Sequence, residues 1–292
     1  MAKKNRPLFK PVVYGEITQG TIFSCATASN YPHKIVHGLT ITARCDFAQS
    51  KYPVLNYLPI VTLHDWFRCD GLEIMLEAEL SEQDGNIRKM LRDASIPESM
   101  PKAVSLRIIA NTHFPLDEGS KKERDKSKRF HELITSFDSF LGVQSGSPDD
   151  IYAWFAKNKP AKISELIKRL SKHAVAGHYL LEYLSDDEEN ASGYVCLLRE
   201  VSTIPRFIAE RIAEGLDSQT HSELIAEADS KVSSLVIDHG DMAMPVSEIA
   251  SPVIEHILQS FSLLYGRIGI ADPHKPTIQL LEKSCLQQPE GA

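Results

Sequence analysis

The hydrophobic periodicity of this chain changes near residue 120, and that change constrains the fold more than any single motif does. Before it, short runs of β-branched residues alternate with polar loops, which is typical of strands. After residue 130, apolar residues recur at i, i+3, i+4 and i+7, which is typical of helices. The sequence therefore predicts an α+β protein whose strand-rich part precedes a mostly helical part.

The strand-rich part spans residues 8–118. Two Gly lie among β-branched residues in the first strand-like segment, as at the bulges and tight corners of a small curved sheet. Residues 35–42, 54–61 and 104–110 have strand composition, residues 44–53 form a polar loop, and residues 70–92 are partly helical in pattern. Several short strands separated by turn signals predict a small barrel or sandwich.

Residues 119–129 lack apolar side chains, and Lys121 to Arg129 hold six cations and two acids. A segment of this composition is expected to be an exposed linker or the start of a helix. It is also the best boundary between two domains. We expect a β-barrel domain over 1–118, a charged linker over 119–129 and a mostly α-helical domain over 130–292.

The helical part shows clear start and stop signals. Ser147 and Pro148 form a helix start of N-cap and first-turn proline, and Gly215 marks a helix end. The expected elements are helices over 130–141, 147–155, 164–170, 203–215 and 252–265, and a strand pair over 178–184 and 194–201. Thr203 and Ser251 are the expected N-caps of the last two helices. A long acidic loop over 185–193 joins the strand pair.

Composition excludes several classes of protein. Hydrophobic residues make up 42% and charged residues 24%, which are globular values. The chain holds no apolar run near the roughly 18 residues that a membrane helix needs, so we expect no membrane contact. Five scattered cysteines and an N-terminus without an apolar signal region indicate a reducing cytoplasm. The net charge of −7 divides into +4 over 1–129 and −11 over 130–292, which suggests different tasks for the two parts.

One stretch carries a family resemblance. Gly20-Thr-Ile-Phe is followed by a polar loop, then by His37-Gly-Leu-Thr-Ile-Thr, a second loop, and the strand from Val54 to Pro59-Ile-Val-Thr62. This order over residues 15–64 resembles the MazF/PemK-type SH3-like barrels. The resemblance implies an SH3-like β-barrel that binds RNA and can cut it beside the 2′-hydroxyl.

The resemblance also implies site residues, with departures from the family pattern. Thr62 matches the family's Thr/Ser position, whereas His37 stands where the family has Arg, and Thr21 stands at its acidic position. Because that Arg would stabilise the charged transition state, His37 would have to act as acid or base instead. The catalytic candidates are His37, Arg44, Asp46 and Thr62.

Two further chemistries involve the same loops. Cys45 between Arg44 and Asp46 could act as a thiolate if a histidine oriented it, and His33, His37 and His64 are the nearest in sequence. Cys25, His33, His37 and Cys45 have the spacing C-x7-H-x3-H-x7-C and are side chains that zinc accepts, although no C-x2-C knuckle is present. No glycine fingerprint for a nucleotide or dinucleotide cofactor occurs, so we expect no cofactor.

These patterns favour a non-catalytic binding or regulatory protein of the bacterial cytoplasm. By analogy with toxin-type barrels, a stress or phage-defence setting is the expected context. The binding candidates are His33 and Lys34 on the barrel loops and Lys121, Lys122 and Arg124 on the basic stretch. We expect a protein partner or self-association, with RNA as a further ligand. The alternative is a MazF-like endoribonuclease that uses the barrel loops.

Overall fold

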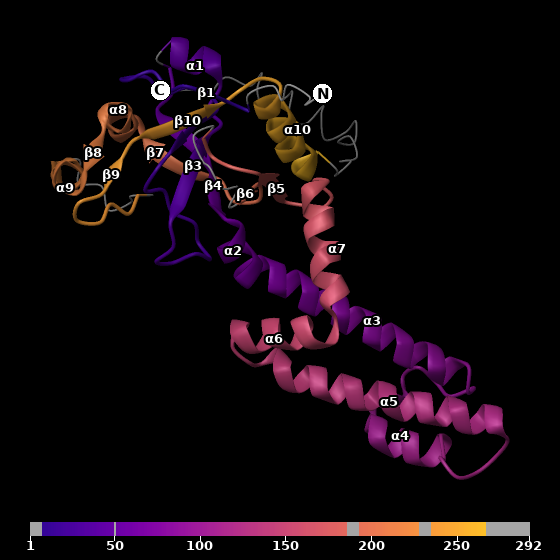
Figure 1. Cartoon of the computed structure of the whole chain (residues 1–292). Coiled ribbons are helices and arrows are strands. Elements are labelled where there is room, and N and C mark those ends of the chain that lie inside the picture. Colours follow the sequence, from indigo (N-terminus) through magenta and orange to yellow (C-terminus); the bar gives the residue numbers. More distant parts are fainter. Residues whose placement is uncertain (1–7, 50, 186–192, 228–234, 267–292) are drawn as a thin grey trace, which may run out of the picture.

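The computed structural model describes residues 8–49, 51–185, 193–227 and 235–266. A curled antiparallel sheet forms one end of the molecule, and a helical arm extends away from it (Figure 1). The arm consists mainly of α3 (Leu72–Arg92), α4 (Leu106–His113) and α5 (Lys121–Gln144). The protein is therefore mixed α/β, and its sheet is a half-barrel.

The sheet has the strand order β1-β10-β2-β3-β4-β6-β5, with β7 paired to β4 beside β6. All of these pairs are antiparallel. The strands are β1 (Phe9–Lys10), β2 (Thr21–Phe23), β3 (Val36–Thr40), β4 (Val54–Thr62), β5 (His178–Leu181), β6 (Tyr194–Leu197), β7 (Ser202–Pro205) and β10 (Pro245–Ile249). Sequence-distant segments thus build one sheet.

The central strand β4 has partners on both edges and cores on both faces. One edge pairs with β3, and the other pairs with β7 along Val54–Tyr57 and with β6 along Ile60–Thr62. Because side chains alternate along a strand, Leu55 and Tyr57 face one core while Leu58 and Ile60 face the other. An apolar strand of this kind needs cover on both sides, and residues 1–118 supply only part of that cover.

Helices from the second half of the chain provide the cover. Ile208 and Ile212 of α8 (Arg206–Glu214) pack into the core that contains Leu55. Ile254 and Ile257 of α10 (Val253–Tyr265) are fully buried in the opposite core, whereas Leu258 and Phe261 of that helix are only partly buried. The sheet is consequently sandwiched between α8 and α10.

The arm is inserted between β4 and β5. It begins with α2 (Leu63–Trp66) and the π-helical turn η1 (Phe67–Gly71), and it returns through α6 (Pro148–Asn158) and α7 (Pro160–Ser171). At its far end, α3, α4 and α5 enclose a separate small core in which the rings of Phe114 and Phe130 stack at 4.0 Å. The far end of the arm thus has a hydrophobic core that is separate from those of the sheet.

The remaining elements are short. They are α1 (Arg44–Ala48), η2 (Met100–Lys102), β8 (Leu216–Asp217), α9 (Ser218–Glu227) and β9 (Met242–Ala243), and β8 pairs with β9. Four cysteines lie in the described residues, and all four carry free thiols. No helix of the described segments is long and apolar enough to cross a membrane.

Several predicted elements are confirmed. Strands β3 and β4, the β5–β6 pair, the capped start of α6 at Ser147 and the end of α8 at Gly215 all lie where the sequence indicated. Most of the acidic loop expected over 185–193, namely residues 186–192, lies outside the described residues.

Four local predictions are wrong. Ser251 does not cap α10, because that helix begins at Val253 and its N-cap is Pro252. The expected strand over 104–110 is helix α4, because Ser105 caps it by accepting from the Ile108 amide and the segment then buries one helical face. Residues 202–205 form β7 against β4, so Thr203 lies in a strand and does not cap α8. Part of the expected polar loop over 44–53 is the short helix α1.

Residues 119–129 were expected to be a linker or a helix start, and Lys121–Arg129 form the first turns of α5. Ser120 accepts a hydrogen bond from the Glu123 amide, and Glu123 accepts one from the Ser120 amide at 2.7 Å. This capping box satisfies amides that a helix start leaves open, and Lys and Arg are good helix formers. Strands that precede this segment in the sequence and strands that follow it belong to the same sheet. The segment therefore does not divide the chain into a sheet part and a helical part.

Candidate functional site

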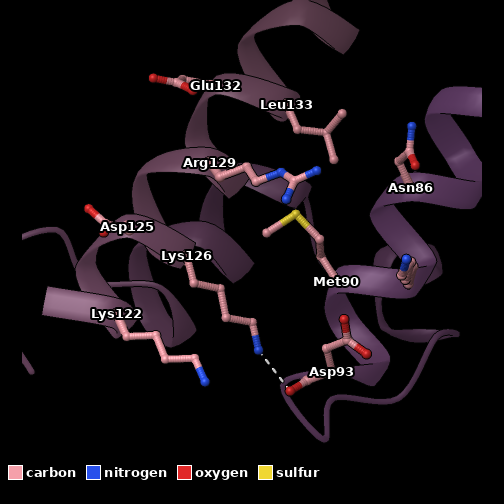
Figure 2. Close-up of a pocket in the computed structure, with 10 residues that line it drawn as sticks. Asn86, Met90, Asp93, Lys122, Asp125, Lys126, Arg129, Glu132 and Leu133 are labelled. Carbon is pink, nitrogen blue, oxygen red and sulfur yellow. Dashed lines mark hydrogen bonds between the residues drawn. The ribbon is translucent and has the colours of Figure 1, made fainter. Parts of the chain in front are cut away.

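A groove with a volume of about 820 Å³ lies between α3 and α5 of the arm. Each helix contributes one face to it, because residues three and four positions apart lie side by side on a helix. The lining residues are Asn86, Lys89, Met90 and Asp93 from α3, and Lys122, Asp125, Lys126, Arg129, Glu132 and Leu133 from α5 (Figure 2).

Cations dominate the inner side of the groove. In Figure 2 the side chains of Lys126 and Arg129 point toward α3, whereas Asp125 and Glu132 point to the outer side of α5. Glu132 lies 4.0 Å from Lys128, which is outside the groove. The four cations of the groove form no ion pair with a carboxylate of the described residues. They are Lys89, Lys122, Lys126 and Arg129. The groove thus gathers four positive charges that the described chain leaves uncompensated at contact distance.

One of these cations is also held in place. The Nζ atom of Lys126 donates a hydrogen bond to the backbone carbonyl of Asp93 at 2.7 Å. Asp93 is the C-cap of α3, where carbonyl groups lack partners within the helix and the helix dipole is negative. Lys126 therefore joins the end of α3 to the first turns of α5 and fixes the width of the groove at that point.

The structure brings only one of the sequence-predicted binding residues into this groove. Lys122 lines it, while Lys121 and Arg124 are exposed on other faces of α5. Lys34 is occupied elsewhere by a 2.8 Å ion pair with Asp65, and His33 lies in an exposed loop with a positive φ of 60°.

The four catalytic candidates occupy different places. Thr62 caps α2 by accepting from the Asp65 amide, and its hydroxyl donates to the Asp65 carboxylate at 2.8 Å. Arg44 follows the opposite end of β3 and lies 3.9 Å from Glu255 of α10. That end of β3 pairs Thr40 with Tyr57 of β4. Thr62 is five residues further along β4 than Tyr57, which is about 16 Å along the strand. The endoribonuclease alternative therefore has no common groove for these two residues.

Each of the other two candidates lies near one of these: His37 pairs with Ile60, two positions before Thr62, and Asp46 is two positions after Arg44 on α1. His37 is largely buried on β3, its ring meets Tyr194 edge-on at 6.1 Å, and burial lowers its pKa to about 4. The imidazole is consequently neutral near pH 7. Asp46 is exposed on α1, where its Oδ1 lies 3.6 Å from the Cys45 thiol.

The proposed zinc ligands do not form a site either. His37 is on β3, Cys45 is on α1 beyond the far end of that strand, and Cys25 and His33 are in loops. Across the part of the chain that the structure describes, no group of three or more His, Cys, Asp or Glu residues is placed to hold a metal ion.

A second cavity of about 500 Å³ lies at the base of the arm, and no sequence motif pointed to it. Asp70, on the π-helical turn, accepts hydrogen bonds at Oδ2 from the Tyr31 hydroxyl at 2.9 Å and from His178 Nε2 at 3.2 Å. Burial alone would raise the pKa of Asp70, but the hydrogen bonds from His178 and Tyr31 outweigh burial and hold it below its usual range.

This network suits a structural role more than acid–base chemistry. His178 turns Nε2 to Asp70, and its Nδ1 is buried without a partner in the described residues. Neither ring nitrogen is therefore open to a ligand in the cavity. The network instead links β5, the loop after β2 and the start of the arm.

Comparison of the chain with protein-family models, with curated proteins and with solved structures found no significant match.

Proposed function

We propose that the protein is a non-catalytic binding protein that takes the phosphate backbone of RNA into the groove between α3 and α5. The observation that supports this is the convergence of Lys89, Lys126 and Arg129, with Lys122, on one groove without ion-pair partners in the described residues. Unpaired cations on a rigid surface attract a polyanion, because each phosphate contact releases condensed counterions.

The expected strength of this effect follows from the number of cations. For a single-stranded ligand, each phosphate contact contributes about −0.7 to the slope of log K against log salt. Four contacts therefore give a slope of about −3. The groove is only modestly positive, since Asp93, Asp125 and Glu132 also line it. Binding is consequently of moderate affinity and strongly dependent on salt.

The setting of this binding protein is part of the same proposal. The order of elements over residues 15–64 supports the proposal that the curled sheet is an SH3-like barrel. By analogy with such barrels, it also supports a cytoplasmic role in stress or phage defence. A protein partner or self-association is retained beside RNA. The acidic loop expected to make that contact falls on residues 186–192, outside the described residues.

Fluorescence anisotropy of a labelled short RNA, titrated with the full chain at several salt concentrations, tests the function. Lys122→Ala and Arg129→Ala should each weaken binding and make the salt slope less steep by about 0.7. Lys157→Ala, an equal charge change on an exposed position of α6, is the control and should change neither quantity. Absence of RNA binding, or equal slopes for all three variants, would rule the function out.

A further inference from the structure

We infer that the groove holds one unpaired base between its helices, so that its ligand is single-stranded RNA. This inference rests on the proposed function and adds the form of RNA that the site accepts. It follows from features of the groove that phosphate binding alone does not explain: an apolar floor, the planar shape of one of its cations and an amide.

The floor of the groove is apolar. Met90 of α3 and Leu133 of α5 line it, and both are only partly buried by the protein. A site that served phosphates alone would gain nothing from exposed apolar surface between its cations. A nucleobase has apolar faces, and covering both Met90 and Leu133 with such a face removes that surface from water.

The guanidinium group of Arg129 lies beside this floor. Figure 2 shows it next to the thioether of Met90, with Leu133 one turn further along α5. A planar guanidinium stacks on a base as well as pairing with a phosphate, which an ammonium group does less well. Arg129 and Met90, side by side, can therefore contact one face of a base together.

The opposite helix offers groups for the edge of the base. Asn86 of α3 is exposed at the rim, and its amide carries both a donor and an acceptor, as the Watson–Crick edge of a base requires. Lys122 and Lys126, one turn apart on α5, are then placed for the phosphates that flank it.

The size of the groove also favours a single strand. A volume of about 820 Å³ lies within the range of small-molecule sites and can hold a nucleotide. In a duplex the bases are stacked inside, and only the backbones would meet the groove. A duplex would thus leave Met90, Leu133 and Asn86 without contacts.

The test compares a short labelled single-stranded RNA with the same strand annealed to its complement. The full chain should bind the single strand at least about fivefold more tightly. Asn86→Ala should remove most of this preference while leaving duplex binding and the salt slope unchanged. Asn111→Ala, at an exposed position of α4 outside the groove, is the matched control.

The outcomes separate the two levels of the argument. Equal affinity for both RNA forms, or a preference that survives Asn86→Ala, would overturn the inference and leave the binding function standing. No binding of either form would remove the proposed function itself. A Leu133→Ala variant gives a second reading of the floor, since it too should weaken only the single strand.

Discussion

Oε1 of Glu79 lies 3.3 Å from Nζ of Lys159, and the Glu79 side chain is fully buried. Glu79 belongs to the outgoing helix α3, whereas Lys159 is the residue just before α7, which returns to the sheet. Lys162 of α7 forms a second ion pair with Glu79, and Gln83 donates a hydrogen bond to it. The base of the arm is thus held by a buried carboxylate with several partners.

Replacing Glu79 should destabilise the protein. Among the described residues, Glu79→Ala leaves Lys162 with only its 2.6 Å pair to the exposed Glu82, and we expect a loss of about 2–4 kcal/mol in the free energy of unfolding. Glu82→Ala is the control and should cost less than about 1 kcal/mol, because its pair is exposed. Urea denaturation measures both, and equal losses would contradict the assigned importance of the buried pair.

The same carboxylate should make stability dependent on pH. Burial alone would raise the pKa of Glu79, but hydrogen bonds from Lys162 and Gln83 and the nearby lysine charges outweigh it and hold the pKa below its usual value of 4.5. A lowered folded-state pKa gives stability that is present above the unfolded pKa and is lost as pH falls through the folded one.

We therefore expect the free energy of unfolding of the wild type to fall more steeply below about pH 5 than that of Glu79→Gln, which cannot titrate at this position. Denaturant titrations of both proteins at a series of acidic pH values measure the difference. Parallel curves for the two proteins would show that Glu79 does not contribute the acid sensitivity.

The start of α5 should depend on its capping box. Ser120→Ala removes the hydroxyl that accepts from the Glu123 amide and should cost about 1 kcal/mol, mostly as fraying of the first turn. Fraying unwinds the backbone at Lys121 and Lys122, so limited digestion with trypsin should cut there faster than in the wild type. Ser145→Ala, at the other end of α5, should leave the cutting rate unchanged. Rapid cutting of the wild type at these sites would instead indicate that the segment is not helical in solution.

Local signals predicted the parts of the fold that depend on near neighbours in sequence. Ser147 and Pro148 start a helix for reasons contained in their own turn, and the apolar run over 54–61 is a strand wherever it is buried. Residues 104–110 have strand composition but lie in a helix, because packing against α5 decides their state.

Of the two helices that line the candidate site, only the contribution of α5 was predictable from the sequence. Lys122, Lys126 and Arg129 are spaced i, i+4 and i+7, so they share one face once the segment is taken as a helix. Their partners Asn86 and Met90 precede them by more than thirty residues, and no local pattern links the two helices. The same holds for Asp70 and His178, which are 108 positions apart in the chain.

The length of α3 gives the arm a mechanical consequence. Its 21 residues span about 31 Å, and its first residues pack into the sheet core through Leu72 and Met75. A stiff rod anchored at one end acts as a lever, so a tilt of about 10° at the base would carry the tip about 5 Å. A displacement of the tip by a ligand bound between α3 and α5 would in this way also move the turn that carries Asp70 and the ion pairs of Glu79.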